Sequence, residues 1–133
     1  MSLLDIFFGR KRTVEKRGLL GSFDRDQIQV GWQKIEELKN VGKPSTFREA
    51  VVEADKLVDF SLDKLFPGRE NAAERLKETK EIFKFNREDY ENLWYAHKLR
   101  NEIVHKVGFE LPSVEAKRLL DYFKKALETL GAL

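Results

Sequence analysis

The sequence contains no cysteine, only two histidines and only three prolines. The absence of cysteine excludes disulfide bonds, thiolate catalysis and cysteine-ligated zinc, and two histidines are too few for a histidine-rich metal centre. The apolar stretches fall far short of the roughly 20 residues that span a bilayer. The basic side chains near the start follow the apolar run, whereas in a signal peptide they precede it. We therefore expect a cytoplasmic protein without a metal, soluble or at most peripheral to a membrane.

The chain of 133 residues is most simply one domain, which excludes a two-domain cofactor enzyme and leads us to expect no cofactor. Charged residues make up 36% and hydrophobic residues 41% of the sequence. This balance is typical of amphipathic helices whose outer faces are solvated. Ten phenylalanines, two tryptophans and three tyrosines supply the apolar surface for a core.

The excess of positive charge lies at the N-terminus, because residues 1–23 carry a net charge of +3 and residues 24–133 a net charge of −1. We divide the chain accordingly into an N-terminal segment, residues 1–23, and a helical domain, residues 24–133. The candidate docking residues of the segment are Phe7, Phe8, Arg10, Lys11 and Arg12. Their pattern suits a membrane surface, a protein partner or an RNA backbone, and an unattached tail is the alternative.

Apolar residues recur every three or four positions in five stretches, which predicts five helices. The expected ranges are 26–40, 47–66, 72–83, 87–106 and 114–130. Thr46 begins a Thr-x-x-Glu capping box before the second stretch, and Asn71 and Ser113 are the expected N-caps of the third and fifth. All three prolines lie between the stretches, and no stretch alternates with the period of a strand. The fold class is therefore all-α, a compact antiparallel bundle of about five helices.

The fourth stretch carries an arginine on its apolar side. On a helical wheel, Arg100 falls within the arc formed by Leu93, Ala96, Ile103, Val104 and Val107. A buried arginine needs a carboxylate, a phosphate or a partner surface, because burying it unpaired costs several kcal/mol. The neighbouring arc carries His97, Asn101 and His105, which are spaced four residues apart and lie within reach of one another.

The string from His97 to His105, with Arg100, then Asn101, and a histidine five positions after the arginine, resembles the signature of HEPN domains. The stretch from residue 46 onward is similar to HEPN-like domains of bacterial proteins, which are all-α. The resemblance implies an RNA-binding or RNA-cleaving module that needs no metal and combines the motifs of two protomers across a homodimer interface. It departs from part of the family at Val107, where toxins controlled by tyrosine modification carry a tyrosine.

The residues of the motif suit cleavage of RNA by its own 2′-hydroxyl. His105 supplies a proton shuttle, and Arg100 supplies a forked cation for the charge that develops on the phosphorus centre. Asn101 would orient His105 or bind a phosphate, and His97 is an accessory residue on the same side.

A purely structural interpretation of the same residues stays open. Arg100 would then form an ion pair with Asp55 of the second stretch, and His105 would serve only the helix dipole. Tyr90 and Trp94 would be core residues and not platforms for bases. The alternative function is a non-catalytic helical interaction module whose N-terminal segment docks to a membrane surface or a larger assembly.

Overall fold

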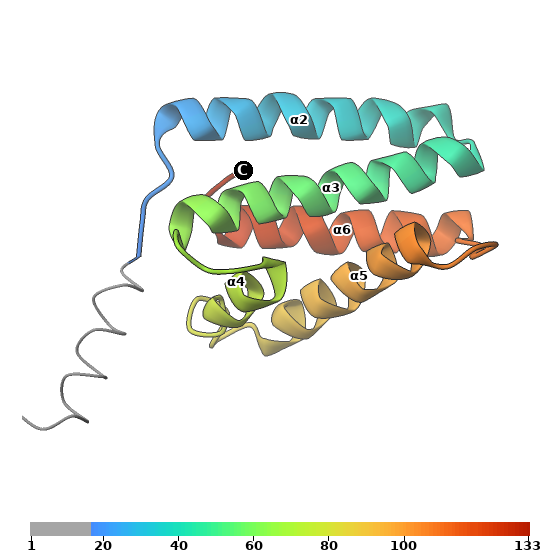
Figure 1. The fold of residues 1–133 in the computed structure, drawn as a ribbon. Helices are drawn as coiled ribbons and strands as arrows, with labels where there is room; N and C mark the ends of the chain where they lie inside the picture. Colours follow the sequence, from blue (N-terminus) through green and yellow to red (C-terminus); the bar gives the residue numbers. More distant parts are fainter. Residues whose placement is uncertain (1–16) are drawn as a thin grey trace, which may run out of the picture.

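The computed structural model describes residues 17–133, and this part of the chain consists of five helices without a strand. The helices are α2 (Ser22–Val41), α3 (Pro44–Leu65), α4 (Ala72–Glu78), α5 (Arg87–His105) and α6 (Ser113–Thr129). The predicted all-α antiparallel bundle is confirmed (Figure 1). The candidate docking residues Phe7, Phe8, Arg10, Lys11 and Arg12 lie outside the described residues.

The central element is α3, which packs against each of the four other helices. Figure 1 shows α2 running antiparallel along one side of α3, while α5 and α6 form an antiparallel pair on another side. The core lies where α3 faces these helices, and its largest fully buried side chains are Ile28, Ile35, Leu62, Phe83, Leu93, Leu119, Leu120, Phe123 and Leu127. Because α3 is amphipathic and its buried side is mostly apolar, the two polar residues buried there, Asp55 and Ser61, are conspicuous.

The residues that precede α2 are attached to the end of α3. The backbone N–H of Gly18 donates a hydrogen bond of 2.6 Å to the carbonyl of Leu65, and Leu20 is buried in the core. A Cβ at position 18 would overlap the carbonyl oxygen of Lys64, so only glycine allows this approach. The core thus includes a residue of the segment 1–23, and the boundary that we placed after residue 23 falls inside α2.

Two helices begin three or four residues earlier than the sequence predicted. The first begins at Ser22, and the Gly21 N–H donates to Oδ2 of Asp24 at 3.1 Å. The second begins at Pro44, which we placed outside it; a proline is accommodated at the first helical position because its missing N–H would have no partner there. Thr46 is consequently inside α3, where its hydroxyl accepts from the Lys43 N–H at 3.1 Å.

The third helix is shorter than expected, ending at Glu78 and not at residue 83. Its N-terminus is as predicted, since Oδ1 of Asn71 accepts from the Glu74 N–H at 2.9 Å. At the other end, the buried hydroxyl of Thr79 donates to the carbonyl of Leu76 at 2.7 Å, a local bond that competes with continued helix. Turns follow up to residue 85, and Phe83 is buried within them. Ser113 begins α6 without a side-chain capping bond.

A hydrogen bond across α5 and α6 provides a pH-dependent probe of their packing. The hydroxyl of Tyr95 donates to Oε1 of Glu115 at 2.9 Å, and this bond raises the pKa of Tyr95 above its ordinary value. A raised phenol pKa means that the bond stabilises the fold below about pH 10 and is lost as the pH rises through the folded-state pKa. We expect Glu115→Gln to lower the pKa of Tyr95, measured as tyrosinate absorbance during alkaline titration. Tyr95→Phe assigns the signal, and a titration unchanged by Glu115→Gln would contradict this account.

Candidate functional site

The carboxylate of Asp55 is the centre of a buried polar cluster between α3 and α5. Asp55 is only 7% exposed. Its Oδ1 lies 2.9 Å from Nδ1 of His97, and its Oδ2 lies 3.3 Å from Nε of Arg100. The predicted ion pair between Arg100 and Asp55 is confirmed, and the sequence did not predict that His97 shares the same carboxylate.

The contact with Asp55 determines which nitrogen of His97 carries a proton. An ionised carboxylate only accepts hydrogen bonds, so we assign Nδ1 of His97 as the donor to Asp55. His97 is buried, and its ring meets the ring of Trp94 edge-on at a centroid distance of 6.2 Å. The crevice beside the pair, between α3, α4 and α5, has a volume of only about 10 Å³, enough for one water at most. His97 therefore packs and orients, and it is not open to a large substrate.

Arg100 is held at its inner edge and turned toward solvent at its outer edge. Nε is buried and has an ionic contact with Asp55 without hydrogen-bond geometry. Nη1 donates to Oδ1 of Asn101 at 3.0 Å, and the side chain is 22% exposed. The guanidinium thus leans toward the side of α5 that carries Asn101, with donors left for an anion.

His105 lies in the last turn of α5 and is exposed. It makes no hydrogen bond or ion pair with the described residues 17–133, so the structure does not join it to Arg100 within one chain. His105 follows Asn101 by four positions, which places the two on one side of the helix. The guanidinium of Arg100 leans toward that same side through Asn101.

The apolar arc that we predicted around Arg100 is buried over only part of its length. Leu93, Ala96 and Ile103 belong to the core, whereas Val104 is 48% exposed and Val107 is fully exposed. Val104 lies in the last turn of α5 and Val107 follows the end of the helix at His105, and neither is buried. Val104 follows Arg100 by four positions, so this exposed valine lies about one turn from Arg100 on the same side of α5.

Arg48 on α3 holds the end of α5 in place. Its Nη1 donates to the carbonyl of Phe109 at 3.1 Å and its Nη2 to the carbonyl of Ile103 at 3.4 Å. These bonds satisfy carbonyls around the C-terminus of α5, where the helix itself supplies no donors. Arg48 was not predictable from local sequence patterns, because its partners are backbone atoms 55 and 61 residues along the chain.

A second ion cluster joins α3 to α4. Nε of Arg75 lies 2.7 Å from Oδ1 of Asp59, and Nη1 lies 3.8 Å from Oδ1 of Asp63. Asp55, Asp59 and Asp63 are spaced four residues apart, so α3 presents one acidic row to the arginines of α4 and α5. That spacing was the available signal for the row, and the positions of its partners depend on helix packing.

No family model matches this chain, and neither the curated proteins nor the solved structures include a match. Within residues 17–133, no group of three or more histidine or carboxylate side chains is arranged to hold a metal ion. In the same part of the chain, no helix has both the length and the apolar character needed to cross a bilayer.

Proposed function

We propose that this chain is an HEPN-like RNA-interacting protein that cleaves RNA without a metal, in a composite site formed by a homodimer. The observation that carries the proposal is the orientation of Arg100, whose guanidinium is anchored by Asp55 and leans toward the side of α5 that carries Asn101 and His105. A guanidinium that is already fixed in position, with its outer donors free, binds a phosphate more favourably than a freely rotating side chain does.

The chemistry proposed for these residues is transfer of the phosphodiester to the neighbouring ribose hydroxyl. A base removes the proton of the 2′-hydroxyl, the 2′-oxygen forms a bond to phosphorus, and the bond from phosphorus to the 5′-oxygen breaks. The departing 5′-oxygen takes up a proton, and the products are a 2′,3′-cyclic phosphate and a 5′-hydroxyl. His105 serves as the proton shuttle, and Arg100 with Asn101 binds the phosphate oxygens.

The homodimer part of the proposal is supported by what surrounds Arg100. His105 and Arg100 do not meet within one chain, so a second protomer would bring the missing partner. The exposed Val104 and Val107 give apolar surface that a second copy would cover. Two such patches related by a two-fold axis would place both motifs at one interface.

The second candidate is a non-catalytic helical interaction module. The specific observation in its favour is that Asp55 already contacts both His97 and Arg100, which gives these residues a structural role without RNA. The docking of its N-terminal segment to a membrane surface or a larger assembly remains a prediction on residues outside the described part of the chain.

The proposal is tested by incubating the wild type with a mixed pool of structured and single-stranded RNA in EDTA. We expect products that end in 2′,3′-cyclic phosphate. Arg100→Lys should lower the cleavage rate by about 100-fold, because lysine keeps the charge beside Asp55 but lacks the fork that binds two phosphate oxygens. The unfolding midpoint of the variant in urea, measured alongside, should stay close to that of the wild type.

Lys124→Gln is the matched control, since it removes an exposed positive charge from α6 and not from α5. It should retain full cleavage activity. Absence of cleavage by a folded, dimeric wild type would overturn the proposed enzyme and favour the interaction module. Equal rates for the wild type and Arg100→Lys would remove Arg100 from the chemistry.

A further inference from the structure

A hollow of about 230 Å³ lies between the turns after α4 and the beginning of α5. Its lining residues are Lys80, Glu81, Phe83, Lys84, Arg87, Tyr90 and Glu91. The hollow lies at the end of the connection between α4 and α5. It is distant from Arg100, because Tyr90 precedes Arg100 by ten residues, or about 15 Å of helix. The volume is below that of most drug-sized pockets, which suits one planar group of modest size.

The unpaired charge of this hollow is positive on balance. Arg87 and Glu91 form an exposed ion pair at 3.5 Å, which leaves Lys80, Lys84 and Glu81. Neither lysine forms an ion pair with any residue of the described chain 17–133. The hollow therefore offers two available ammonium groups against one carboxylate, and anions are favoured there.

The hollow also has aromatic surface, which a simple anion site does not need. The ring of Tyr90 is half-buried and supplies this surface, and it lies 6.2 Å from the fully buried ring of Phe83 beneath it. Beside them Phe85 is 88% exposed, with Nζ of Lys84 over its ring at 5.2 Å. Aromatic faces combined with lysines fit a ligand that has both a planar ring and a phosphate, which is the chemistry of a nucleotide unit.

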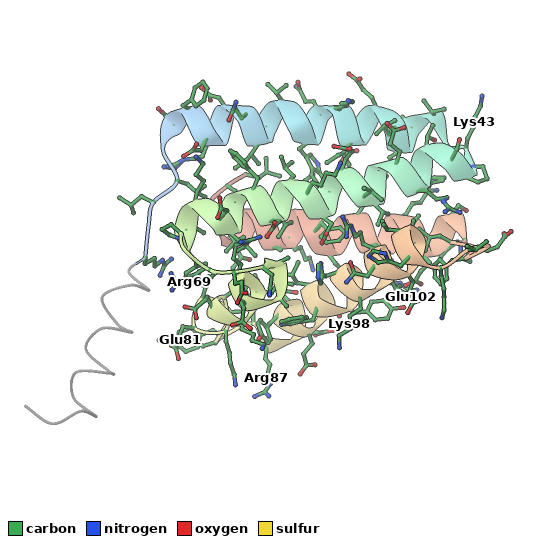
Figure 2. All side chains as sticks on the ribbon, in the orientation of Figure 1. Lys43, Arg69, Glu81, Arg87, Lys98 and Glu102 are labelled. Atoms are coloured by element: carbon green, nitrogen blue, oxygen red, sulfur yellow. The ribbon has the colours of Figure 1, made fainter. Side chains whose placement is uncertain are left out.

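One side of α5 connects this hollow to the site at Arg100. Tyr90, Trp94, Asn101 and His105 lie on this side, which we call the α5 flank, and their spacing of four, seven and four keeps them in line along the helix. It is a different side of α5 from the one that meets α6, where Tyr95 bonds to Glu115. Tyr90 and Trp94 are half-buried and pack against the core with part of their surface. Nζ of Lys98 lies 6.0 Å from the ring of Trp94, and Figure 2 shows Lys98 and Arg87 extending from α5 away from α3.

We propose that the α5 flank is a track for single-stranded RNA, and that the hollow at Lys80, Lys84 and Tyr90 holds one base and its phosphate at the far end of that track. This inference rests on the proposed function, because that function places the other end of the RNA strand at Arg100. From Tyr90 to His105 the flank covers fifteen residues, or about 22 Å, which is long enough for several nucleotides of an extended strand. Stacking on aromatic side chains together with lysine contacts is the usual mode for binding single strands without strict sequence preference.

The test measures binding through Trp94 itself. The chain has two tryptophans, and Trp32 is buried in the core, so Trp32→Phe leaves Trp94 as the only reporter. A short 2′-O-methyl oligouridine is the probe, because its blocked hydroxyl cannot be cleaved. We expect the oligouridine to quench the fluorescence of Trp94 upon stacking.

The paired variant Lys80→Gln with Lys84→Gln removes the two available charges of the hollow. Each phosphate contact to a single strand contributes about 0.7 to the slope of log affinity against log salt, so the slope should fall by about 1.4 and the affinity by roughly 25-fold at about 0.1 M salt. The matched control is Lys124→Gln with Lys125→Gln, two exposed lysines on α6 with the same change in charge. The control should retain nearly the full affinity and slope.

The outcomes separate this inference from the proposed function. Binding that depends on Lys80 and Lys84 without any RNA cleavage would support the track and overturn the ribonuclease. Cleavage that depends on Arg100, with equal binding by the hollow variant and the α6 control, would support the ribonuclease and overturn the track. No binding and no quenching of Trp94 would overturn the track as well.

Discussion

Replacing Asp55 with alanine is expected to lower the free energy of unfolding by about 3–5 kcal/mol. The carboxylate is 7% exposed and contacts His97 at 2.9 Å and Arg100 at 3.3 Å. Its removal leaves the guanidinium of Arg100 partly buried without a counter-charge and the Nδ1–H of His97 without an acceptor. Both groups still carry the free-energy cost of desolvation, and they lose the interaction with Asp55 that offset this cost.

Urea unfolding followed by circular dichroism measures this loss. Asp63→Ala is the control from the same row of α3, because Asp63 is 61% exposed and 3.8 Å from Arg75; we expect it to cost less than about 1 kcal/mol. The double variant Asp55→Leu with Arg100→Met should recover part of the stability, since apolar groups of similar size can replace a buried ion pair, while the Nδ1–H of His97 still lacks an acceptor. A small effect of Asp55→Ala, similar to that of Asp63→Ala, would mean that the cluster is solvated and not a structural centre.

The four longer helices were predictable because each one buries an apolar stripe. α3 illustrates this, since its buried positions from Phe47 to Leu65 recur at the helical period. The start of α3 was missed because proline was treated as a separator, although it is favoured as a first helical residue. The end of α4 was missed for a different reason: Phe83 is buried as the pattern indicates, but in a turn and not in a helix. Periodicity reports which side chains are buried, and it does not report the backbone that buries them.

The contacts of the candidate site were predictable only where the sequence of one helix was enough to infer the partner. An arginine among apolar neighbours needs an acidic partner, and Asp55 at the edge of the apolar face of α3 was a sufficient clue. That His97 shares Asp55 depends on how α5 crosses α3, and that Arg48 holds the end of α5 depends on the path of the chain after His105. Such contacts join residues about 40 to 60 positions apart, and no local spacing encodes them.

His105→Ala is expected to lower RNA cleavage by about 1,000-fold while leaving the free energy of unfolding within about 1 kcal/mol of the wild type. His105 is exposed and bonds to no side chain of residues 17–133, so its removal breaks no packing. Histidine is the side chain whose ordinary pKa allows it to take and return a proton near neutral pH. The rate of appearance of 2′,3′-cyclic phosphate ends in EDTA measures the activity, and urea unfolding measures the stability.

His105→Lys separates catalysis from the helix dipole. A lysine in the last turn of α5 retains a positive charge near the C-terminal carbonyls, which is all that the structural interpretation of His105 requires. If His105 serves only the dipole, the lysine variant behaves as the wild type in both assays. If His105 shuttles a proton, the lysine variant is as stable as the wild type and as inactive as His105→Ala, because an ammonium group seldom releases its proton at neutral pH. Only an inactive, stable lysine variant supports the assignment of His105 to the chemistry, together with Arg100 held in position by Asp55.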